Sequence, residues 1–192
     1  MEYVCIMGRS NSGKKTVLKT LKSIGFEHNI SYTTREPRVI NGKTEQNGEY
    51  YKFVTEEQFM NLVKNDKIVE YTRYKGALYG TKRPYGAKKF VSLIELNGYR
   101  KLKEIYKKQI IGVYLDCDYT ISQKRGIRDG SEENFDIVYN NEYEKSLESM
   151  KAESDIVINS GRDLNNVIAD ILKKIKSMED ISEWKDVYSV MQ

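Results

Sequence analysis

A glycine-rich loop near the N-terminus constrains this chain more than any other feature. Residues 8–16 read GRSNSGKKT and match the pattern GxxxxGK. The apolar run Tyr3–Met7 precedes the loop, and apolar residues at helical spacing follow it from Lys14 to Ile24. A strand, a loop of this kind and a helix turn several backbone N–H groups toward one anion at the start of the helix. The order therefore predicts a nucleotide phosphate site within an α/β fold.

Two adjacent lysines at the end of the loop support this prediction and also modify it. Lys14 can extend its ammonium group along the β- and γ-phosphates of a nucleotide. The next position normally carries the Ser or Thr hydroxyl that ligates Mg²⁺, and here it is Lys15. Thr16 follows, but adjacent helix positions point about 100° apart. Thr16 is therefore only a candidate Mg²⁺ ligand, and no metal ligand is assigned.

The rest of the chain alternates between apolar runs and helical segments, which favours a parallel sheet flanked by helices. Phe90–Leu96, Ile110–Leu115 and Ile156–Ile158 are near-continuous apolar runs, typical of buried parallel strands. Leu164–Ile175 has the apolar spacing of an amphipathic helix, and one more short helix is expected within residues 178–192. These segments predict the core of the fold.

A shorter antiparallel unit interrupts the alternation. Residues 30–47 have no helical period and are expected to form a loop. Tyr51–Val54 alternates like a strand, and Thr55–Gln58 has the capping-box pattern that begins a helix. Ile68–Tyr74 and Ala77–Tyr79 are predicted to pair as a hairpin. This unit is the candidate insertion in the α/β core.

Composition excludes several classes of protein. The chain has 192 residues, with 32 Lys and Arg against 28 Asp and Glu, and its formal charge of +4 does not by itself indicate nucleic-acid binding. Cys5 and Cys117 lie in apolar segments without metal-ligand spacing and are expected to be reduced core thiols. No secretion signal and no apolar run of about 18 residues is present. We therefore expect a cytoplasmic protein that has neither nucleic acid nor a membrane as a partner.

A second phosphate site is predicted after the first helix. Ser31–Arg38 reads SYTTREPR and holds two arginines on either side of a rigid proline. Guanidinium groups in this arrangement can clamp a phosphate with paired, charge-assisted hydrogen bonds. When the segment is considered alone, two ordinary surface arginines are the alternative interpretation.

Taken together, the motifs resemble those of the guanylate kinase family. The family's segments follow the glycine loop in order: Ser31–Arg38, NGEYYKFV at Asn47–Val54, Glu70, and LYGT at Leu78–Thr81. The resemblance implies an α/β P-loop kinase, with a parallel-sheet core flanked by helices, an inserted small mixed α/β GMP-binding unit and a helical lid. The implied division assigns residues 1–30, 83–122 and 150–177 to the core, 31–82 to the GMP-binding insertion, 123–149 to the lid and 178–192 to a C-terminal extension.

The resemblance also implies roles for individual residues. The expected ATP-binding set comprises Gly8, Ser10, Asn11, Ser12, Gly13, Lys14, Lys15, Thr16 and Asn159. The expected GMP-binding set comprises Ser31, Arg35, Arg38, Tyr51, Glu70, Tyr79, Thr81 and Glu95. In this set the arginines and tyrosines hold the phosphate, and Glu70 accepts hydrogen bonds from the N1–H and N2–H groups of guanine. Lys14, Arg125 and Arg128 are expected to be catalytic, because the reaction mainly needs alignment and positive charge over the transferring phosphoryl group.

Three departures from the family pattern bear on activity. Lys15 replaces the metal-ligating hydroxyl, and Leu93 occupies a position that is acidic in the family and offers a second route to Mg²⁺. The segment Val138–Tyr143 lacks the further arginine expected of the lid. Each departure can lower the rate, and loss of such an arginine can cost about 10³-fold.

The implied function is ATP-dependent phosphorylation of GMP, and of dGMP, to the diphosphate in purine nucleotide metabolism. ATP with Mg²⁺ and GMP are the implied small molecules, and a monomer or homodimer is the expected form. Two alternatives stay open. A guanylate-kinase-like module without catalysis would bind a nucleotide or a phosphorylated partner through Arg35 and Arg38. A P-loop kinase for another phosphorylated small molecule would keep the glycine loop but not the preference for guanine.

Overall fold

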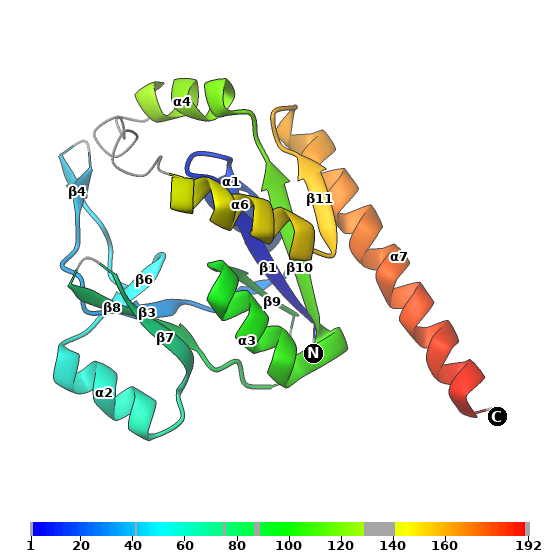
Figure 1. Ribbon diagram of the computed structural model, residues 1–192, viewed down its shortest axis with the longest axis horizontal. Helices are drawn as coiled ribbons and strands as arrows, with labels where there is room; N and C mark the ends of the chain where they lie inside the picture. The colour runs from blue at the N-terminus through cyan, green and yellow to red at the C-terminus, as the bar shows by residue number, and fades with distance from the viewer. Residues whose placement is uncertain (1, 41, 75, 87–88, 129–140, 191–192) are drawn as a thin grey trace.

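The computed structural model describes residues 2–40, 42–74, 76–86, 89–128 and 141–190 of the chain (Figure 1). Side chains are described throughout these ranges except at Ile40, Tyr74, Asn141, Glu142 and residues 179–190.

The core is a five-stranded sheet in which every strand pair is parallel, with the order β11-β10-β1-β9-β2. The strands are β1 (Glu2–Gly8), β2 (Glu27–His28), β9 (Lys89–Leu93), β10 (Ile110–Asp116) and β11 (Ile156–Asn159). Because parallel strands place their carboxyl ends at one edge of a sheet, the loops that follow β1, β10 and β11 meet there. The glycine loop is one of these loops.

Helices cover both faces of this sheet, and the side chains of β1 show why. Val4 and Ile6 are fully buried in the cluster that includes α1 (Lys14–Ser23) and α7 (Leu164–Val190). The alternate residues Tyr3, Cys5 and Met7 are buried in a second cluster, against α3 (Leu96–Tyr106) and α6 (Asn141–Glu153). A short 3-10 helix, η1 (Lys107–Gln109), joins α3 to β10. A strand with apolar residues on both faces must be central, which explains the near-continuous apolar runs.

A second sheet of four strands has the order β6-β3-β8-β7 and lies beside the core (Figure 1). Its strands are β3 (Ser31–Thr33), β6 (Tyr51–Phe53), β7 (Ile68–Tyr74) and β8 (Ala77–Lys82), and β4 (Val39–Ile40) pairs separately with β5 (Lys43–Thr44). Helix α2 (Glu56–Lys64) covers one face, where Phe59, Ile68 and Leu78 form a buried cluster. The other face is left for polar side chains.

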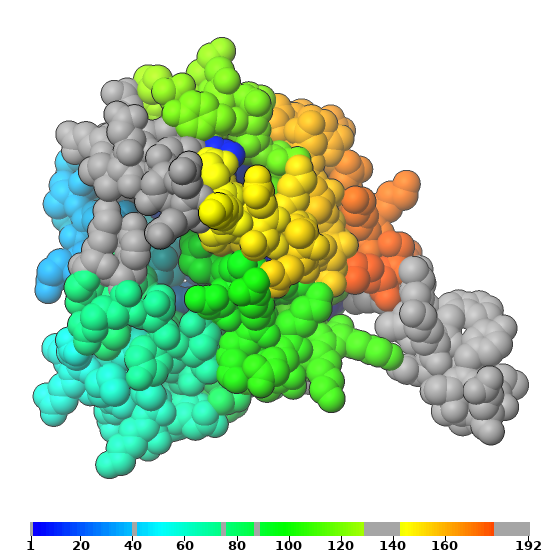
Figure 2. Space-filling model, in the orientation of Figure 1, coloured from blue at the N-terminus to red at the C-terminus, as the bar shows by residue number. Residues whose placement is uncertain are grey.

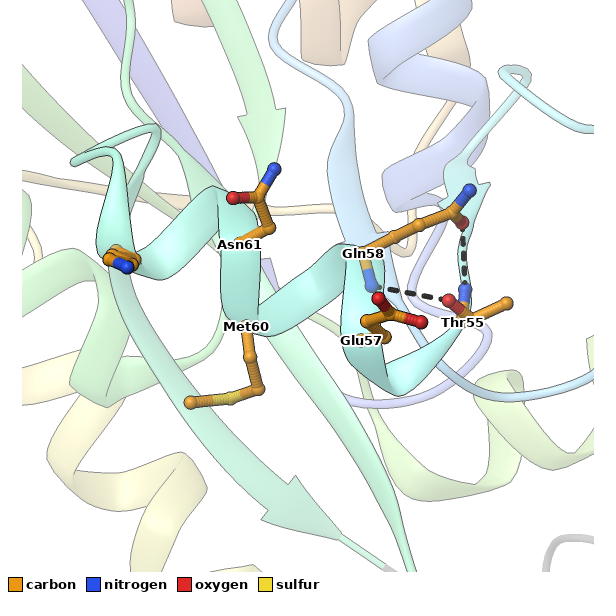
Figure 3. Close-up of a pocket in the computed structure, with 6 residues that line it drawn as sticks. Thr55, Glu57, Gln58, Met60 and Asn61 are labelled. Atoms are coloured by element: carbon orange, nitrogen blue, oxygen red, sulfur yellow. Dashed lines mark hydrogen bonds between the residues drawn. The ribbon is translucent and has the colours of Figure 1, made fainter.

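Helix α2 begins with the capping box expected from the sequence. The Gln58 backbone N–H donates to Thr55 Oγ1 at 3.1 Å, and the Thr55 N–H donates to Gln58 Oε1 at 3.0 Å (Figure 3). These two bonds satisfy donors that a helix start leaves without partners. A surface pocket drawn in the same figure is lined by these two residues and by others of α2, so it lies on the outer side of this unit.

Most of the segments predicted for the core and the insertion are confirmed. The strand, loop and helix at residues 2–23, the hairpin of β7 and β8, and the start of α2 lie where the sequence places them. The hairpin of β7 and β8 is antiparallel as predicted, but the four-stranded sheet is mixed, because β3 pairs with β6 in parallel. The proposed domain boundaries remain a prediction.

The predicted ends or types of several segments are wrong. The expected strand Phe90–Leu96 ends at Leu93, because Leu96 already begins α3. The expected short helix within residues 178–192 is not separate, since α7 continues to Val190. Residues 30–47, expected as a loop, contain β3, which pairs with β6 and β8 elsewhere in the chain, and β4 and β5, which pair with each other as a short hairpin. The predicted lid is described only where it overlaps α4 (Tyr119–Arg128) and α6, and residues 129–140 lie outside the described part.

Replacement of Thr55 by Ala should lower the free energy of unfolding by about 1 kcal/mol, because the N-cap hydroxyl is lost. Urea denaturation followed by circular dichroism measures this change. Thr55→Ser keeps the hydroxyl and serves as the control, with stability close to that of the wild type. Equal stability of the Ala variant and the wild type would show that the capping box does not stabilise α2.

Candidate functional site

The glycine loop has the backbone geometry of an anion site at a helix start. Gly8 has a φ of 139°, and a Cβ at this position would lie 2.7 Å from the carbonyl oxygen of Leu115 in β10. Gly13 has a left-handed φ of 97° and precedes the first residue of α1. Both conformations strain any residue other than glycine. The two glycines therefore allow the loop to curl closely over the carboxyl edge of the sheet.

Lys14 is folded over this loop. Its Nζ donates to the carbonyl oxygens of Gly8 and Arg9, each at 2.7 Å. Burial lowers the pKa of Lys14 to about 8, although the charge of Glu95 acts in the opposite direction. The ammonium group is thus held at the loop by backbone acceptors. A negative charge brought to the loop would stabilise its charged form.

Arg125 of α4 lies on the other side of the same loop. One guanidinium nitrogen would be 3.8 Å from a Cβ placed on Gly13, and another donates to the Ser160 carbonyl oxygen at 2.9 Å. Arg128 is exposed in the last turn of α4. Asn159 ends β11, and its Oδ1 accepts from the Gly161 N–H at 2.9 Å. Of the two predicted catalytic arginines, Arg125 is therefore within contact distance of the loop.

Side chains of the loop itself differ in their surroundings. Ser12 is buried, and its Oγ has no hydrogen-bond partner among the described residues, so a ligand oxygen could supply one. Lys15 points instead to the ring of Tyr50, with its Nζ 4.3 Å from the ring centre. Thr16 is exposed on α1. Leu93, at the position that is acidic in the family, is partly buried and packs on the core.

Helix α6 contacts the loop through two residues that the sequence analysis did not single out. The Ser10 backbone N–H donates to the hydroxyl of Tyr143 at 2.9 Å, and Arg9 forms a bidentate pair with Glu144 at 3.1 and 3.2 Å. In Figure 2 only a small blue area of the N-terminal segment is visible between α4 and α6. No local sequence signal predicts these contacts, because residues 9–10 and 143–144 meet only through the packing of α6 on the sheet.

The polar face of the four-stranded sheet carries most of the predicted GMP-binding residues. Ser31 pairs with Tyr51, and Thr33, on the same face as Ser31, pairs with Tyr79. Paired residues on neighbouring strands share a face, as do residues two apart in one strand. The residues gathered on the face opposite α2 are Ser31, Tyr51, Glu70, Tyr79 and Thr81.

Glu70 is half-buried on this face. Its Oε1 accepts from the Thr81 hydroxyl at 2.7 Å, and burial raises its pKa although this bond opposes the rise. Gly98 in α3 faces the same oxygen, since a Cβ there would lie 2.8 Å from it. Glu70 is thus fixed by Thr81 on one side and by the helix backbone on the other.

Arg35 and Arg38 lie next to the carboxylate of Glu45. The carboxylate of Glu45 is 2.7 Å from an Arg35 guanidinium nitrogen and accepts from the Arg38 backbone N–H at 2.9 Å. Burial opposes the effect, but these partners hold the pKa of Glu45 below its usual range. Arg35 also lies over the rings of Tyr51 and Phe53. The segment therefore holds an oxyanion between the two predicted arginines.

Glu95 connects the two halves of the site. It is the exposed residue that precedes α3, and its charge acts on both Lys14 and Tyr51. Burial raises the pKa of Tyr51, and the charge of Glu95 adds to this rise. The glycine loop and the polar face therefore both lie within range of this one charge.

A parallel α/β sheet with a glycine loop at its carboxyl edge defines a P-loop protein that binds phosphate groups. The sequence model of the family described as guanylate kinase matches residues 1–180, and the chain belongs to the guanylate kinase family.

Individual relatives agree with this assignment. The chain is 38% identical to the guanylate kinase of Lactobacillus delbrueckii over 108 residues, which cover 52% of this chain and 51% of that protein. With the Listeria monocytogenes enzyme the identity is 28% over 192 residues, 95% of this chain and 89% of the relative. The chain thus spans about half the length of the Lactobacillus relatives in these alignments. The crystal structure of guanylate kinase from Anaplasma phagocytophilum has the same fold, with a TM-score of 0.64, 18% identity and coverage of 92% and 85%.

The described residues also lack two other features, a metal-ligating cluster and a membrane-spanning helix. They contain no group of three or more His, Cys, Asp or Glu side chains arranged to hold a metal ion. None of the helices in that part of the chain is long and apolar enough to cross a membrane.

Removal of the Tyr143 hydroxyl should strengthen the binding of phosphate chains at the loop. Tyr143→Phe leaves the Ser10 N–H without an internal acceptor, so a phosphate oxygen no longer has to displace one. The expected gain is about 2- to 10-fold in affinity for inorganic tripolyphosphate, measured by isothermal titration calorimetry. Tyr71→Phe, on the exposed surface of β7, is the matched control. Weaker binding by Tyr143→Phe would contradict competition and indicate that the hydroxyl itself contacts phosphate.

Proposed function

We propose that the chain transfers the γ-phosphoryl group of ATP to GMP or dGMP, giving ADP and the nucleoside diphosphate. The observation that carries this proposal is the contact between the helix of the glycine loop and the segment that enters the polar face. The ammonium group of Lys15, in the first turn of α1, lies 4.3 Å from the ring centre of Tyr50, and Tyr51 of the polar face is the next residue. A donor phosphate at the loop and an acceptor phosphate at this face would then lie close enough for in-line transfer.

The ATP side of the proposal rests on the glycine loop. Backbone N–H groups at the start of α1 and the Lys14 ammonium group would bind the β- and γ-phosphates. The side chains of Ser10, Asn11 and Ser12 line the same loop, and Asn159 lies at the end of the neighbouring strand. In this proposal Arg125 and Arg128 supply positive charge over the transferring phosphoryl group. The charge is needed because phosphoryl transfer depends on electrostatic stabilisation more than on proton transfer.

The GMP side rests on the polar face. Arg35 and Arg38 would exchange the Glu45 carboxylate for the GMP phosphate, because both are anions that accept the same hydrogen bonds. Tyr51 and Tyr79 contribute phenolic donors beside them. Glu70 would read guanine, since a carboxylate held by Thr81 can accept from the N1–H and N2–H groups, which adenine does not offer together. Ser31 and Thr81 complete the base pocket.

Two positions that carry oxygen ligands for Mg²⁺ in the family pattern do not carry them in this chain. The hydroxyl position is Lys15, whose ammonium group lies over Tyr50, and Leu93 takes the place of an acidic residue. Mg²⁺ is a hard cation that prefers oxygen ligands, so these two residues do not fit it, and Thr16 stays the candidate ligand. We propose that Mg²⁺ enters as part of the ATP substrate complex.

The cellular and structural setting remains predicted as well. We propose a cytoplasmic protein that works in purine nucleotide metabolism as a monomer or homodimer, with the core, GMP-binding, lid and C-terminal segments divided as the family resemblance implies.

A coupled assay of purified protein with ATP, Mg²⁺ and each nucleoside monophosphate tests the proposal. We expect ADP release with GMP and dGMP, and at least about 10⁴-fold lower kcat/KM with AMP, because a buried polar group left without its partner makes the wrong base costly. Absence of ADP release with every acceptor, together with calorimetric binding of GMP, would indicate a binding module instead. Preference for another monophosphate would contradict the role of Glu70.

Nucleotide affinity should fall with rising pH above about 8. The free-state pKa of Lys14 is lowered to about 8 by burial, and bound phosphate favours the charged lysine. Below this pH the lysine is charged with or without the nucleotide, so its contribution is constant. Above it, each pH unit should weaken ATP binding by up to about tenfold. Calorimetry between pH 7 and 9.5 measures the slope, and Lys14→Arg, which stays charged, should remove it. A flat profile for the wild type would contradict this assignment.

A further inference from the structure

Lys15 has a partner that explains its presence in a position normally occupied by a hydroxyl. It lies in the first turn of α1, and its Nζ is 4.3 Å from the centre of the Tyr50 ring. This distance is well inside the range in which a cation is attracted to an aromatic face. The lysine therefore reaches out of the phosphate loop toward the segment that enters β6.

Other contacts hold the same segment against α1. Lys19, one turn after Lys15, is 3.7 Å from the Glu49 carboxylate and 6.0 Å from the Tyr50 ring centre. The Tyr50 ring packs on the buried cluster between α1 and the core sheet. Residues 49–50 are thus docked on the helix that begins at the glycine loop.

The docked segment continues directly into the proposed acceptor site. Tyr51 follows Tyr50 and is the first residue of β6. Its backbone carbonyl accepts from the Gly48 N–H at 2.8 Å, and its ring lies edge-on to Tyr79 at 5.9 Å. Arg35 lies over the same ring at 5.7 Å. A displacement of Tyr50 would therefore move a phenol that contacts two other residues of the proposed GMP phosphate site.

We propose that Lys15 is a positioning residue, which ties the donor loop to the acceptor strand by holding Tyr50 and, through it, Tyr51. The proposal rests on the proposed function for the identity of the acceptor, GMP. A serine or threonine at position 15 is too short to reach the ring, so the loss of a metal-ligating hydroxyl and the gain of this contact are one change. In this proposal Lys15 acts on the reaction through Tyr51, in place of the contact with ATP that the family resemblance implies.

The size of the effect follows from the exposure of the contact. Lys15 is exposed and Tyr50 is half-buried, and cation–π contacts of this kind are modest. Loss of the contact should raise the KM for GMP about 3- to 10-fold. The KM for ATP should change less than about 2-fold, because the loop backbone and Lys14 are not altered.

Steady-state kinetics of Lys15→Met, Lys15→Arg and Lys15→Thr test this proposal. Methionine keeps the unbranched stem but not the charge and should raise the KM for GMP, whereas arginine keeps the cation and should restore it. Lys22→Met, an exposed lysine of the same helix, is the matched control and should match the wild type. Equal effects on GMP and ATP, or no effect, would overturn the proposal. So would a Lys15→Thr variant with a lower Mg²⁺ requirement and an unchanged KM for GMP.

Hydrogen exchange separates this proposal from the proposed function. Amides of residues 48–53 should exchange faster in Lys15→Met than in the wild type and in Lys22→Met, with or without turnover. If the wild type does not phosphorylate GMP, the proposed function fails while this measurement still tests the contact. Identical exchange in all three proteins would overturn the positioning role.

Discussion

The close approach of the loop backbone to β10 is the constraint on which the rest of the site depends. At Gly8 there is no space for a Cβ beside the carbonyl oxygen of Leu115. The loop can therefore begin at the end of β1 and curl over the sheet edge without leaving it, so that α1 starts with its N–H groups directed toward one position. Lys14 closes this arrangement by bonding to two loop carbonyls.

The second half of the site depends on which face of the small sheet is covered. Helix α2 buries Phe59, Ile68 and Leu78 on one face, and Gly80 allows the Phe59 ring to approach the strand closely. The opposite face is left polar, and the charge of Glu95 acts on Tyr51 of this face as well as on Lys14 of the glycine loop. Two arginines near the proposed phosphate sites are paired with carboxylates of the protein itself. Glu45 lies against Arg35, and Glu144 lies against Arg9.

The departures from the family pattern have a structural account in two cases. Lys15 contacts Tyr50, and Leu93 packs on the apolar core. Neither side chain offers the oxygen atom that the family pattern has at its position. In place of an added arginine, the described start of α6 brings Tyr143 and Glu144 to the glycine loop. Both residues satisfy groups that could otherwise bind phosphate, which makes α6 part of the environment of the donor site.

The sequence by itself determined the strand–loop–helix unit, the central apolar strands, the capping box of α2 and the hairpin of β7 and β8. Each depends on neighbours within a few residues: glycine conformation, hydrophobic period or side-chain capping. Only the tertiary structure decided where β9 ends, that residues 31–33 form a strand, and that Arg125 reaches the loop while Tyr143 and Glu144 contact it. These features join residues as many as 135 positions apart, as in the pair of Arg9 and Glu144. Local propensity carries no information about such contacts, because the packing of helices on the sheet brings their partners together.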